Sequence, residues 1–359
     1  MSEAKNKPHI AVLAGDGIGP EVMQQALRVL HKVAPEVTYS HGLIGGAAYV
    51  KYQQHFPTAT KKLINQVDAV LFGSVGGPIE ATDSPQWLNC EVNSILALRN
   101  HLNLSVNVRP AKFYSSLANI SPLKNHLFNA CDEILIYREL LGDIYFGDKR
   151  SFKVDGQVVA EDVASYNEAQ IKTIALQAFE SAAQRSGKLT SVDKANVLET
   201  SRLWRQVFNQ VAKDYPQVEL SHMLVDNCAM QLILNPAQFD VIATANLFGD
   251  ILSDAASALP GSLGMMPSAS FNDKGFGLYE PSGGSAPDIA NQDVANPMAQ
   301  LLSLAMLLRH SLNKDAAASA IEQAIEQVLA SGFRTLDISE STCQTLGTTA
   351  FTDQVLKQL

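Results

Sequence analysis

The sequence contains no apolar run long enough to span a bilayer, and its first nine residues, MSEAKNKPH, lack the hydrophobic segment of a secretory signal. It also contains no basic stripe with interleaved aromatic residues, and its net charge of -9 disfavours nucleic acid as a partner. There are no low-complexity runs and no internal repeats. We therefore expect a cytoplasmic globular protein that binds neither membranes nor nucleic acid.

Cysteine is scarce, and no pair of cysteines has C-x-x-C spacing. The four are Cys90, Cys131, Cys228 and Cys343. Such scattering offers no zinc site and fits reduced, packed thiols in a reducing compartment. The rest of the composition, with 46% hydrophobic and 18% charged residues, is that of an ordinary globular enzyme. A length of 359 residues exceeds what one core usually supports, so we expect two domains.

The N-terminal part of the chain has the pattern of an open α/β sheet. Residues 9–14 (HIAVLA) predict a buried strand, which breaks at GDGIGPE before an amphipathic helix at about 22–33. The glycines of this turn do not have the G-x-G-x-x-G spacing, so we expect no Rossmann fingerprint. A second strand at 68–73 runs into the glycine-rich turn SVGGP, at the strand end where open α/β sheets place ligand loops.

Two carboxylates dominate the stretch NLFGDILSD. An apolar strand at 239–245 precedes it, so we expect a turn and then a helix capped by Asn246. Asp250 and Asp254 are four residues apart and share one helical face. Oxygen ligands on a stiff element suit Mg²⁺ or Mn²⁺. The alternative is a solvated helix face, which the apolar neighbours of the two aspartates make less attractive.

Three arginines emerge from apolar elements. Arg99 follows a helical segment, Arg109 lies in an extended segment and Arg138 ends the strand EILIYREL, shortly before Tyr145. A guanidinium near a core requires an anion, and its planar fork matches a carboxylate. Together they predict an anion pocket, although each arginine alone is compatible with a surface salt bridge.

Lys194 and Asp226 both follow apolar runs. Lys194 lies between the strand LTSVD and the strand-like ANVLE, so its amine is expected near the end of a sheet. It is a candidate general base if its surroundings lower its pKa, and otherwise a solvated lysine. Asp226 adds a third carboxylate to the candidate metal ligands.

Glycine, proline and serine are concentrated after the aspartate helix, in LYEPSGGSAPDIANQDVANP. The backbone N–H groups of residues 283–286 can approach a phosphate without obstruction, although a mobile loop would have the same composition. Two amphipathic helices, at 298–312 and 316–330, are predicted to cover a sheet.

These segments together resemble the isocitrate/isopropylmalate dehydrogenase family of β-decarboxylating hydroxyacid dehydrogenases. The resemblance runs through nearly the whole chain, in the order GDGIGPE, VGGP, LALR, NVRP, RELLGDIYFG, DKANVLETSRLWR, VDNCAMQL, NLFGDILSD, EPSGGSAPDIA and ANP. It implies a homodimer with an active site shared between subunits, and a two-domain protomer that binds NAD without a Rossmann fingerprint. Residues 1–106 and 262–359 would form the first domain, and residues 107–261 the second, with the dimer contact.

The resemblance also implies a role for each matching residue. Arg99, Arg109 and Arg138 match the clamp for substrate carboxylates, and Tyr145 and Lys194 match the acid/base pair, with Lys194 reaching across from the other subunit. Asp250 and Asp254 match the metal ligands of one subunit and Asp226, which also borders the substrate, the ligand from the other. The NAD site would comprise Glu280, Gly284, Ser285, Ala286, Asp288, Ile289 and Asn296.

Two specificities follow from these matches. A carboxylate at Asp288 accepts hydrogen bonds from a ribose diol and repels a 2′-phosphate, so NAD rather than NADP is expected. Ile95 and Leu96, four and three residues before Arg99, suit an isopropyl group and oppose a third carboxylate. The expected reaction is therefore the oxidative decarboxylation of 3-isopropylmalate in leucine biosynthesis, and Glu91 would lie near the nicotinamide.

Some alternatives and departures remain. Related dehydrogenases acting on isocitrate, homoisocitrate, tartrate or malate would share every catalytic residue, and a Mg²⁺-dependent lyase or hydrolase could use the aspartates and arginines without NAD. The pair of glycines usual before IYFG in the family is Gly142 and Asp143 here. The late loop has no histidine before its glycines.

Overall fold

The computed structural model describes residues 7–359, so the expectation for the N-terminal nine residues falls largely outside the described range. The chain divides into two compact units. Unit 1 comprises Met1–Leu102, Tyr114–Ile120 and Gly261–Leu359, and unit 2 comprises Asn103–Phe113 and Ser121–Pro260. Within residues 7–359, no helix is both long enough and apolar enough to cross a membrane. The predicted assignment of cofactor and substrate roles to two domains stays a prediction.

Unit 1 contains a mostly parallel sheet. Its strands, in spatial order, are β2 (Thr38–His41), β1 (His9–Gly15), β3 (Ala69–Ser74), β12 (Gly277–Pro281) and β11 (Pro267–Phe271). Only the pairing of β12 with β11 is antiparallel among these. β3 is buried at every position, as expected for a strand covered on both faces.

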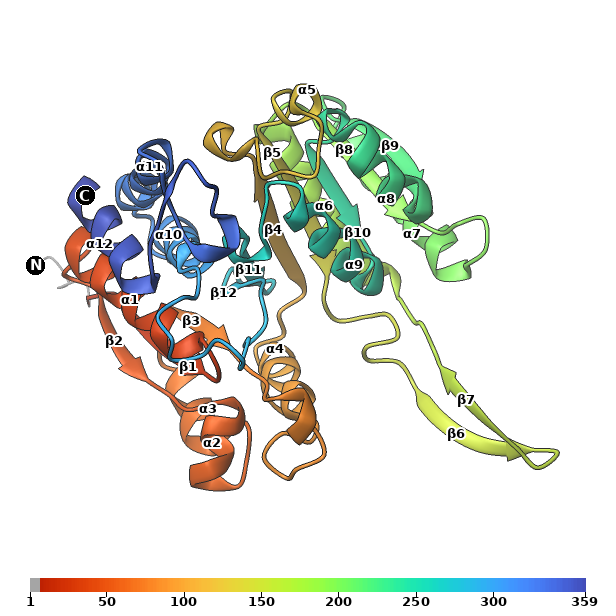
Figure 1. Ribbon diagram of the computed structural model, residues 1–359. Coiled ribbons are helices and arrows are strands. Elements are labelled where there is room, and N and C mark those ends of the chain that lie inside the picture. Colours follow the sequence, from red (N-terminus) through yellow and green to blue (C-terminus); the bar gives the residue numbers. More distant parts are fainter. Residues whose placement is uncertain (1–6) are drawn as a thin grey trace, which may run out of the picture. The chain divides into compact units, whose positions relative to one another are not determined.

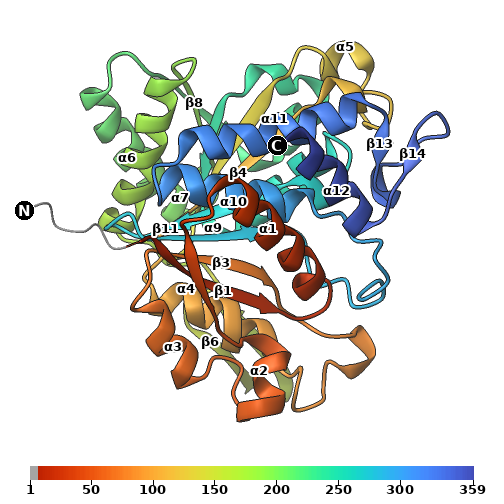
Figure 2. The same ribbon diagram turned by 90° about the vertical axis from the view of Figure 1, so that its left-hand side faces the viewer.

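Helices from the two ends of the chain cover the sheet of unit 1. Figure 2 shows α1 (Gly19–Val33) beside α10 (Met298–His310), α11 (Asp315–Ala330) and α12 (Thr348–Gln358). α10 is apolar around most of its circumference and is buried from Met298 to Leu308, so it forms the centre of this core. The shorter helices of unit 1 are α2 (Gly45–Tyr52), α3 (Thr58–Ile64), a π-helix (Val92–Leu96) and α4 (Ala97–His101).

Unit 2 contains a second sheet segment, and most of the candidate residues follow its strands. The spatial order is β4 (Val106–Lys112), β5 (Glu133–Glu139), β10 (Val241–Thr244), β8 (Lys188–Asp193) and β9 (Glu219–Leu224). β5, β10, β8 and β9 run parallel, and β4 is antiparallel to β5. The carboxyl ends of the parallel strands therefore meet at one edge, where ligand sites of open α/β sheets occur.

The helices of unit 2 are α5 (Asn125–Phe128), α6 (Glu168–Gln184), α7 (Glu199–Val211), α8 (Val225–Leu234) and α9 (Asn246–Ala258). α6 begins with a capping box made by Asn167 and Gln170. α6 packs on α7, with the ring centroids of Phe179 on α6 and Phe208 on α7 6.2 Å apart. β6 (Lys149–Val154) and β7 (Gln157–Asp162) form a hairpin that extends away from the sheet of unit 2 (Figure 1).

The structure confirms the predicted α/β class and most of the predicted elements, with three corrections. The first of the two helices predicted to be amphipathic, α10, is not amphipathic, because every residue from Met298 to Leu308 is buried. The residues ANVLE do not form a strand, because 195–198 lead through a turn into α7. Asn246 is not the cap of α9, because its side-chain oxygen accepts a hydrogen bond from Arg138 and the capping position is Ala245. The helix itself, with both aspartates, lies where the sequence predicts it.

Candidate active site

Two buried arginines in unit 2 point their guanidinium groups at the aspartate helix. Arg109 on β4 is 6% exposed and Arg138 on β5 is 2% exposed. Arg138 forms an ion pair with Asp250, and Arg109 lies 3.7 Å from Asp250 and 3.2 Å from Asp254. Because a buried guanidinium is costly without an anion, these aspartates stabilise the position of both arginines. The predicted anion pocket therefore has two of its members in direct contact with the predicted metal ligands.

Tyr145 completes this cluster. Its hydroxyl donates a hydrogen bond to Asp250 Oδ2 at 2.6 Å, and the guanidinium of Arg138 lies over its ring at 5.3 Å from the centroid. Burial raises the pKa of Tyr145, and the hydrogen bond to Asp250 raises it further, while Arg138 opposes both effects. A tyrosine with a raised pKa keeps its proton at neutral pH, as a general acid requires.

Asp254 lies one turn beyond Asp250 on the same face of α9. Burial raises the pKa of Asp254, Arg109 lowers it, and the nearby charge of Asp250 raises it. Its side chain is 56% exposed, so it is accessible to an additional cation. Such a cation would relieve the repulsion between the two carboxylates.

Lys194 and Asp226 form an ion pair of their own. Lys194 follows β8, Asp226 lies in the first turn of α8, and Lys194 Nζ is 2.5 Å from Asp226 Oδ1. The hydrogen bond from Lys194 lowers the pKa of Asp226. Among residues 7–359 of a single chain, no group of three or more His, Cys, Asp or Glu side chains is arranged to hold a metal ion. Asp250 and Asp254 nevertheless offer the oxygen donors that Mg²⁺ and Mn²⁺ prefer, so their chemistry fits the predicted ion once a further ligand is supplied.

Arg99, the third predicted arginine, lies in unit 1. Its guanidinium is 2.8 Å from Glu280 Oε1, and both side chains are buried. The Nε of Arg99 has no hydrogen-bond partner within the described residues. This N–H group of the guanidinium therefore remains available to a ligand. The family resemblance predicts Arg99 at the substrate and Glu280 at NAD, and in the structure these two side chains form an ion pair with each other.

The late loop rests on the turn between β1 and α1. Ile18 N donates to Ser285 O at 2.8 Å, and Asn291 N donates to Glu21 Oε2 at 2.8 Å. Gly17 has φ +57°, and a Cβ there would meet Ser285 O at 1.9 Å. Gly17 is therefore required by both its conformation and its contact with the loop.

The predicted NAD residues in this loop border open or unsatisfied groups. A Cβ added at Gly284 would meet no heavy atom of residues 7–359 within 4 Å, which leaves room for a phosphate. A cavity of about 40 Å³ is lined by Gly284, Asn296 and Gln300, among others. The amide of Gln300 is buried, and neither its nitrogen nor its oxygen has a partner in the described part of the chain. Unpaired groups of this kind fit a ligand that supplies hydrogen bonds. Asp288 is exposed, and Ala286 has φ +38°.

Three polar residues that the sequence analysis did not assign to the site hold the arginines in place. Asn107 Oδ1 accepts from Arg109 Nε at 2.8 Å, Ser253 Oγ accepts from Arg109 at 2.7 Å, and Asn246 Oδ1 accepts from Arg138 at 3.0 Å. The period of two along β4 puts Asn107 on the same face as Arg109, which is a signal in the sequence. The roles of Ser253 and Asn246 require the packing of α9 on the sheet.

Comparisons with known proteins identify the family. Residues 9–355 match the model of the family described as isocitrate/isopropylmalate dehydrogenase. The chain belongs to this family. Its relatives include the 3-isopropylmalate dehydrogenase of Neisseria meningitidis serogroup A, which is 52% identical over 98% of this chain and 99% of the relative. The 3-isopropylmalate dehydrogenase of Escherichia coli K12 is 53% identical over 92% of each chain.

Solved structures of the family have the same fold. The isocitrate dehydrogenase of Methylococcus capsulatus superposes with a TM-score of 0.86 at 32% identity, over 98% of this chain and 99% of that one. The β-decarboxylating dehydrogenase of Thermococcus kodakarensis, in its apo form, gives a TM-score of 0.79 at 33% identity, over 98% and 96% of the two chains. The fold class and the family membership expected from the sequence are confirmed.

Proposed function

We propose that the protein catalyses the NAD-dependent oxidative decarboxylation of 3-isopropylmalate to 4-methyl-2-oxopentanoate, a step of leucine biosynthesis. The observation that carries the proposal is the cluster in which Arg109, Arg138 and Tyr145 surround Asp250, with Asp254 one turn further along α9. This cluster offers cations for carboxylates, a proton donor and two metal-binding oxygens in one place. The two 3-isopropylmalate dehydrogenases described above, each more than half identical to this chain, support the same substrate.

Each side chain of the cluster then has a chemical task. Arg109 and Arg138 bind substrate carboxylates through their planar forks, with Arg99 as the third arginine of the clamp. Lys194 of the partner subunit accepts the proton of the C2 hydroxyl as hydride leaves C2. After CO₂ has departed, Tyr145 donates a proton to the carbon that carried it.

Two bound groups would supply the remaining chemistry. Asp250 and Asp254, with Asp226 of the partner subunit, would hold Mg²⁺ or Mn²⁺, and Glu280, Gly284, Ser285, Ala286, Asp288, Ile289 and Asn296 would hold NAD. When bound, the metal stabilises negative charge on the substrate oxygen and NAD⁺ accepts the hydride. Asp288, as an exposed carboxylate, favours the ribose diol of NAD over the 2′-phosphate of NADP.

The residues that select the substrate would lie in the helical segment just before Arg99. Val92–Leu96 is a π-helix, and π-helical turns occur frequently at functional sites. Ile95 is packed in the core, whereas Leu96 is partly exposed and is the better placed of the two to contact an isopropyl group. Apolar contact opposes the additional carboxylate of isocitrate, because an unpaired charge against leucine is costly.

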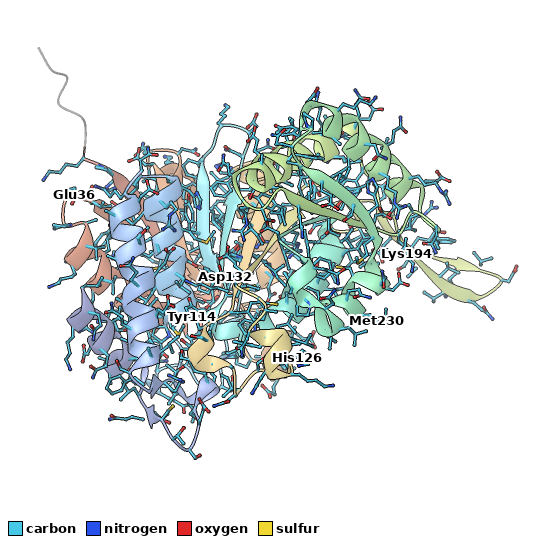
Figure 3. The ribbon with its side chains drawn as sticks, turned by 90° about the horizontal axis from the view of Figure 1, so that it is seen from above. Glu36, Tyr114, His126, Asp132, Lys194 and Met230 are labelled. Carbon is cyan, nitrogen blue, oxygen red and sulfur yellow. The ribbon has the colours of Figure 1, made fainter. Side chains whose placement is uncertain are left out.

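A second copy of the chain would complete the site. α8 exposes Met230, Ile233 and Leu234, which are 48%, 59% and 58% exposed, and α9 exposes Ile251 beside the metal-binding face. Figure 3 marks the positions of Met230 on α8 and of Lys194, both within unit 2. Large exposed apolar side chains on two helices that pack against each other are typical of an interface. Burying it against a second copy would bring Lys194 and Asp226 of the partner subunit to Asp250 and Asp254.

The test is NADH formation by the purified protein with 3-isopropylmalate, isocitrate, homoisocitrate, tartrate and malate, each with and without Mg²⁺. We expect kcat/KM for 3-isopropylmalate to exceed that for each other substrate by at least about tenfold, and NADH formation to require the metal. A higher kcat/KM for isocitrate, homoisocitrate, tartrate or malate would assign the chain to another activity of the family. Turnover of these acids without NAD would instead favour the lyase alternative.

A further inference from the structure

The loop that carries Tyr145 contains a residue in an unfavourable backbone conformation. Asp143 has φ +70°, in the left-handed region that glycine adopts freely and other residues avoid. The preceding residue, Gly142, is a glycine for another reason, because a Cβ there would meet the ring of Tyr166 at 2.2 Å. A residue that persists in such a conformation is held by its surroundings, and such residues are concentrated at functional sites.

Each carboxylate oxygen of Asp143 accepts a hydrogen bond from a backbone N–H group. Asp143 is 7% exposed. Its Oδ1 accepts from Ile144 N at 2.9 Å, and its Oδ2 accepts from Leu247 N at 3.0 Å. The first contact lies within the Tyr145 loop and the second in the first turn of α9. One side chain thus joins the loop to the helix.

α9 depends on this contact because it has no cap of its own. Its capping position is Ala245, which offers no side-chain acceptor. The donors of its first turn are met from elsewhere in the chain, with Asn246 N donating to Tyr166 Oη at 2.9 Å and Leu247 N to Asp143. A carboxylate at this end of a helix is also favoured by the helix dipole.

The loop makes two further contacts with α9: Asn246 Nδ2 donates to Gly142 O at 3.3 Å, and one turn further along Tyr145 donates to Asp250. Asp143 and Tyr145 are two residues apart in the loop, and Leu247 and Asp250 are three apart on the helix. The contacts of Asp143 and Tyr145, at this spacing, fix both the position and the rotation of the loop relative to α9. Without the Asp143 contact, the loop would be held on α9 only by the long hydrogen bond to Gly142 O and by the Tyr145 hydroxyl itself.

We propose, on the basis of the function proposed above, that Asp143 is a positioning residue that holds the proton donor Tyr145 in register with the metal-binding helix α9. It acts through the backbone of Ile144 and Leu247 and does not touch the substrate. Displacements of about 1 Å in a catalytic group can reduce turnover a hundredfold, so the contact has a direct consequence for rate.

The test compares Asp143→Gly, which removes the carboxylate and accepts the left-handed conformation, with Asp143→Asn, which keeps one acceptor oxygen. We expect kcat to fall by about 10-fold to 100-fold in Asp143→Gly and by less in Asp143→Asn, with KM for the substrate within about threefold of wild type. KM is spared because Arg109 and Arg138 lie on strands that the substitution leaves in place. Mn²⁺ affinity of the substrate-free protein, measured by electron paramagnetic resonance, should weaken in the same order.

Two matched controls separate positioning from stability. Asp155→Gly removes another left-handed aspartate, φ +50°, at the tip of the β6–β7 hairpin, and should leave kcat and Mn²⁺ affinity unchanged. Asp293→Gly removes a left-handed aspartate whose Oδ1 accepts from Thr349 N in the first turn of α12, so it should lower thermal stability without weakening Mn²⁺ binding.

Wild-type kcat and Mn²⁺ affinity in folded Asp143→Gly would overturn the proposal, as would a loss of Mn²⁺ affinity no greater than that of Asp293→Gly. Turnover by the wild-type protein distinguishes a failure of the proposed function from a failure of this proposal about Asp143. If wild type turns over none of the panel substrates, the function is wrong, and the Mn²⁺ measurements alone still decide whether Asp143 holds the Tyr145 loop in register with α9.

Discussion

Arg109 and Arg138 are the residues around which the candidate site of unit 2 is built. Each is almost fully buried, and each has a carboxylate of α9 within ion-pair distance. Because Asp250 is 36% exposed and Arg109 also pairs with Asp254, removing the charge of Asp250 should cost less than the roughly 3 to 5 kcal/mol of a fully buried pair. The aspartates therefore serve the fold as well as the proposed chemistry, and neutralising Asp250 is expected to lower stability in addition to metal binding.

The role of Tyr145 is tested by Tyr145→Phe. The substitution removes the hydroxyl that donates to Asp250 and, in the proposed reaction, the proton given to carbon. General acid catalysis contributes about 10²-fold to 10⁴-fold, and kcat should fall within that range while substrate KM changes little. The measurement is steady-state NADH formation, with Tyr52→Phe in the exposed part of α2 as the control. A kcat equal to that of the control would remove Tyr145 from the mechanism.

Glu139, behind the Tyr145 loop, gives a prediction for pH dependence. Its side chain is 1% exposed, and burial raises its pKa from 4.5 to about 7 against the opposing hydrogen bonds from Leu141 N and Gly142 N. Because the folded-state pKa is the higher one, the folded protein binds more protons between these values. The free energy of unfolding should therefore fall as pH rises from 4.5 to about 7 and level off above.

Glu139→Gln removes this ionisation. Relative to the variant, wild type should lose up to about 3 kcal/mol across the interval, measured by denaturant unfolding at a series of pH values. A constant difference between the two proteins over the same range would show that Glu139 does not titrate there.

At the scale of elements, the sequence predicted most strands and helices because their apolar periodicity is local. The shared face of Asp250 and Asp254 follows from their spacing alone. The errors arose where a role depends on a distant element. Asn246 has the chemistry of a cap, but β5 places Arg138 beside it, and its oxygen accepts from the guanidinium instead. The pairing of Arg99 with Glu280 joins residues 181 positions apart, which no local pattern encodes.

The contact between the β1–α1 turn and the late loop gives a prediction for cofactor binding. Gly17→Ala would place a Cβ 1.9 Å from Ser285 O and strain a left-handed residue, so the loop must move. We expect KM for NAD to rise by at least about tenfold. Gly275→Ala is the matched control, since Gly275 also has a positive φ, +79°, and a Cβ there meets no described atom within 4 Å. Equal KM values for the two variants would separate the loop from cofactor binding.

At the scale of the whole molecule, the proposal requires two copies of the chain. Ile233→Asp places a charge in the apolar surface of α8, where it would be desolvated in a dimer. We expect sedimentation at the mass of one chain and a loss of kcat/KM of at least about a hundredfold, because Lys194 and Asp226 would no longer reach a second site. Val50→Asp, on α2, is a control at a similarly exposed position, 66% against 59% for Ile233, and should remain a fully active dimer. A fully active Ile233→Asp monomer would contradict the shared site.

The most direct test of the shared site mixes two inactive variants, Lys194→Ala and Asp250→Asn. Each homodimer carries the defect in both sites. In a hybrid dimer, one site receives both defects and the other receives neither, provided that Lys194 and Asp250 of each site come from different subunits. Unfolding and refolding an equal mixture should therefore restore about a quarter of the wild-type activity. Recovery no greater than the sum of the two variants refolded separately would contradict the account.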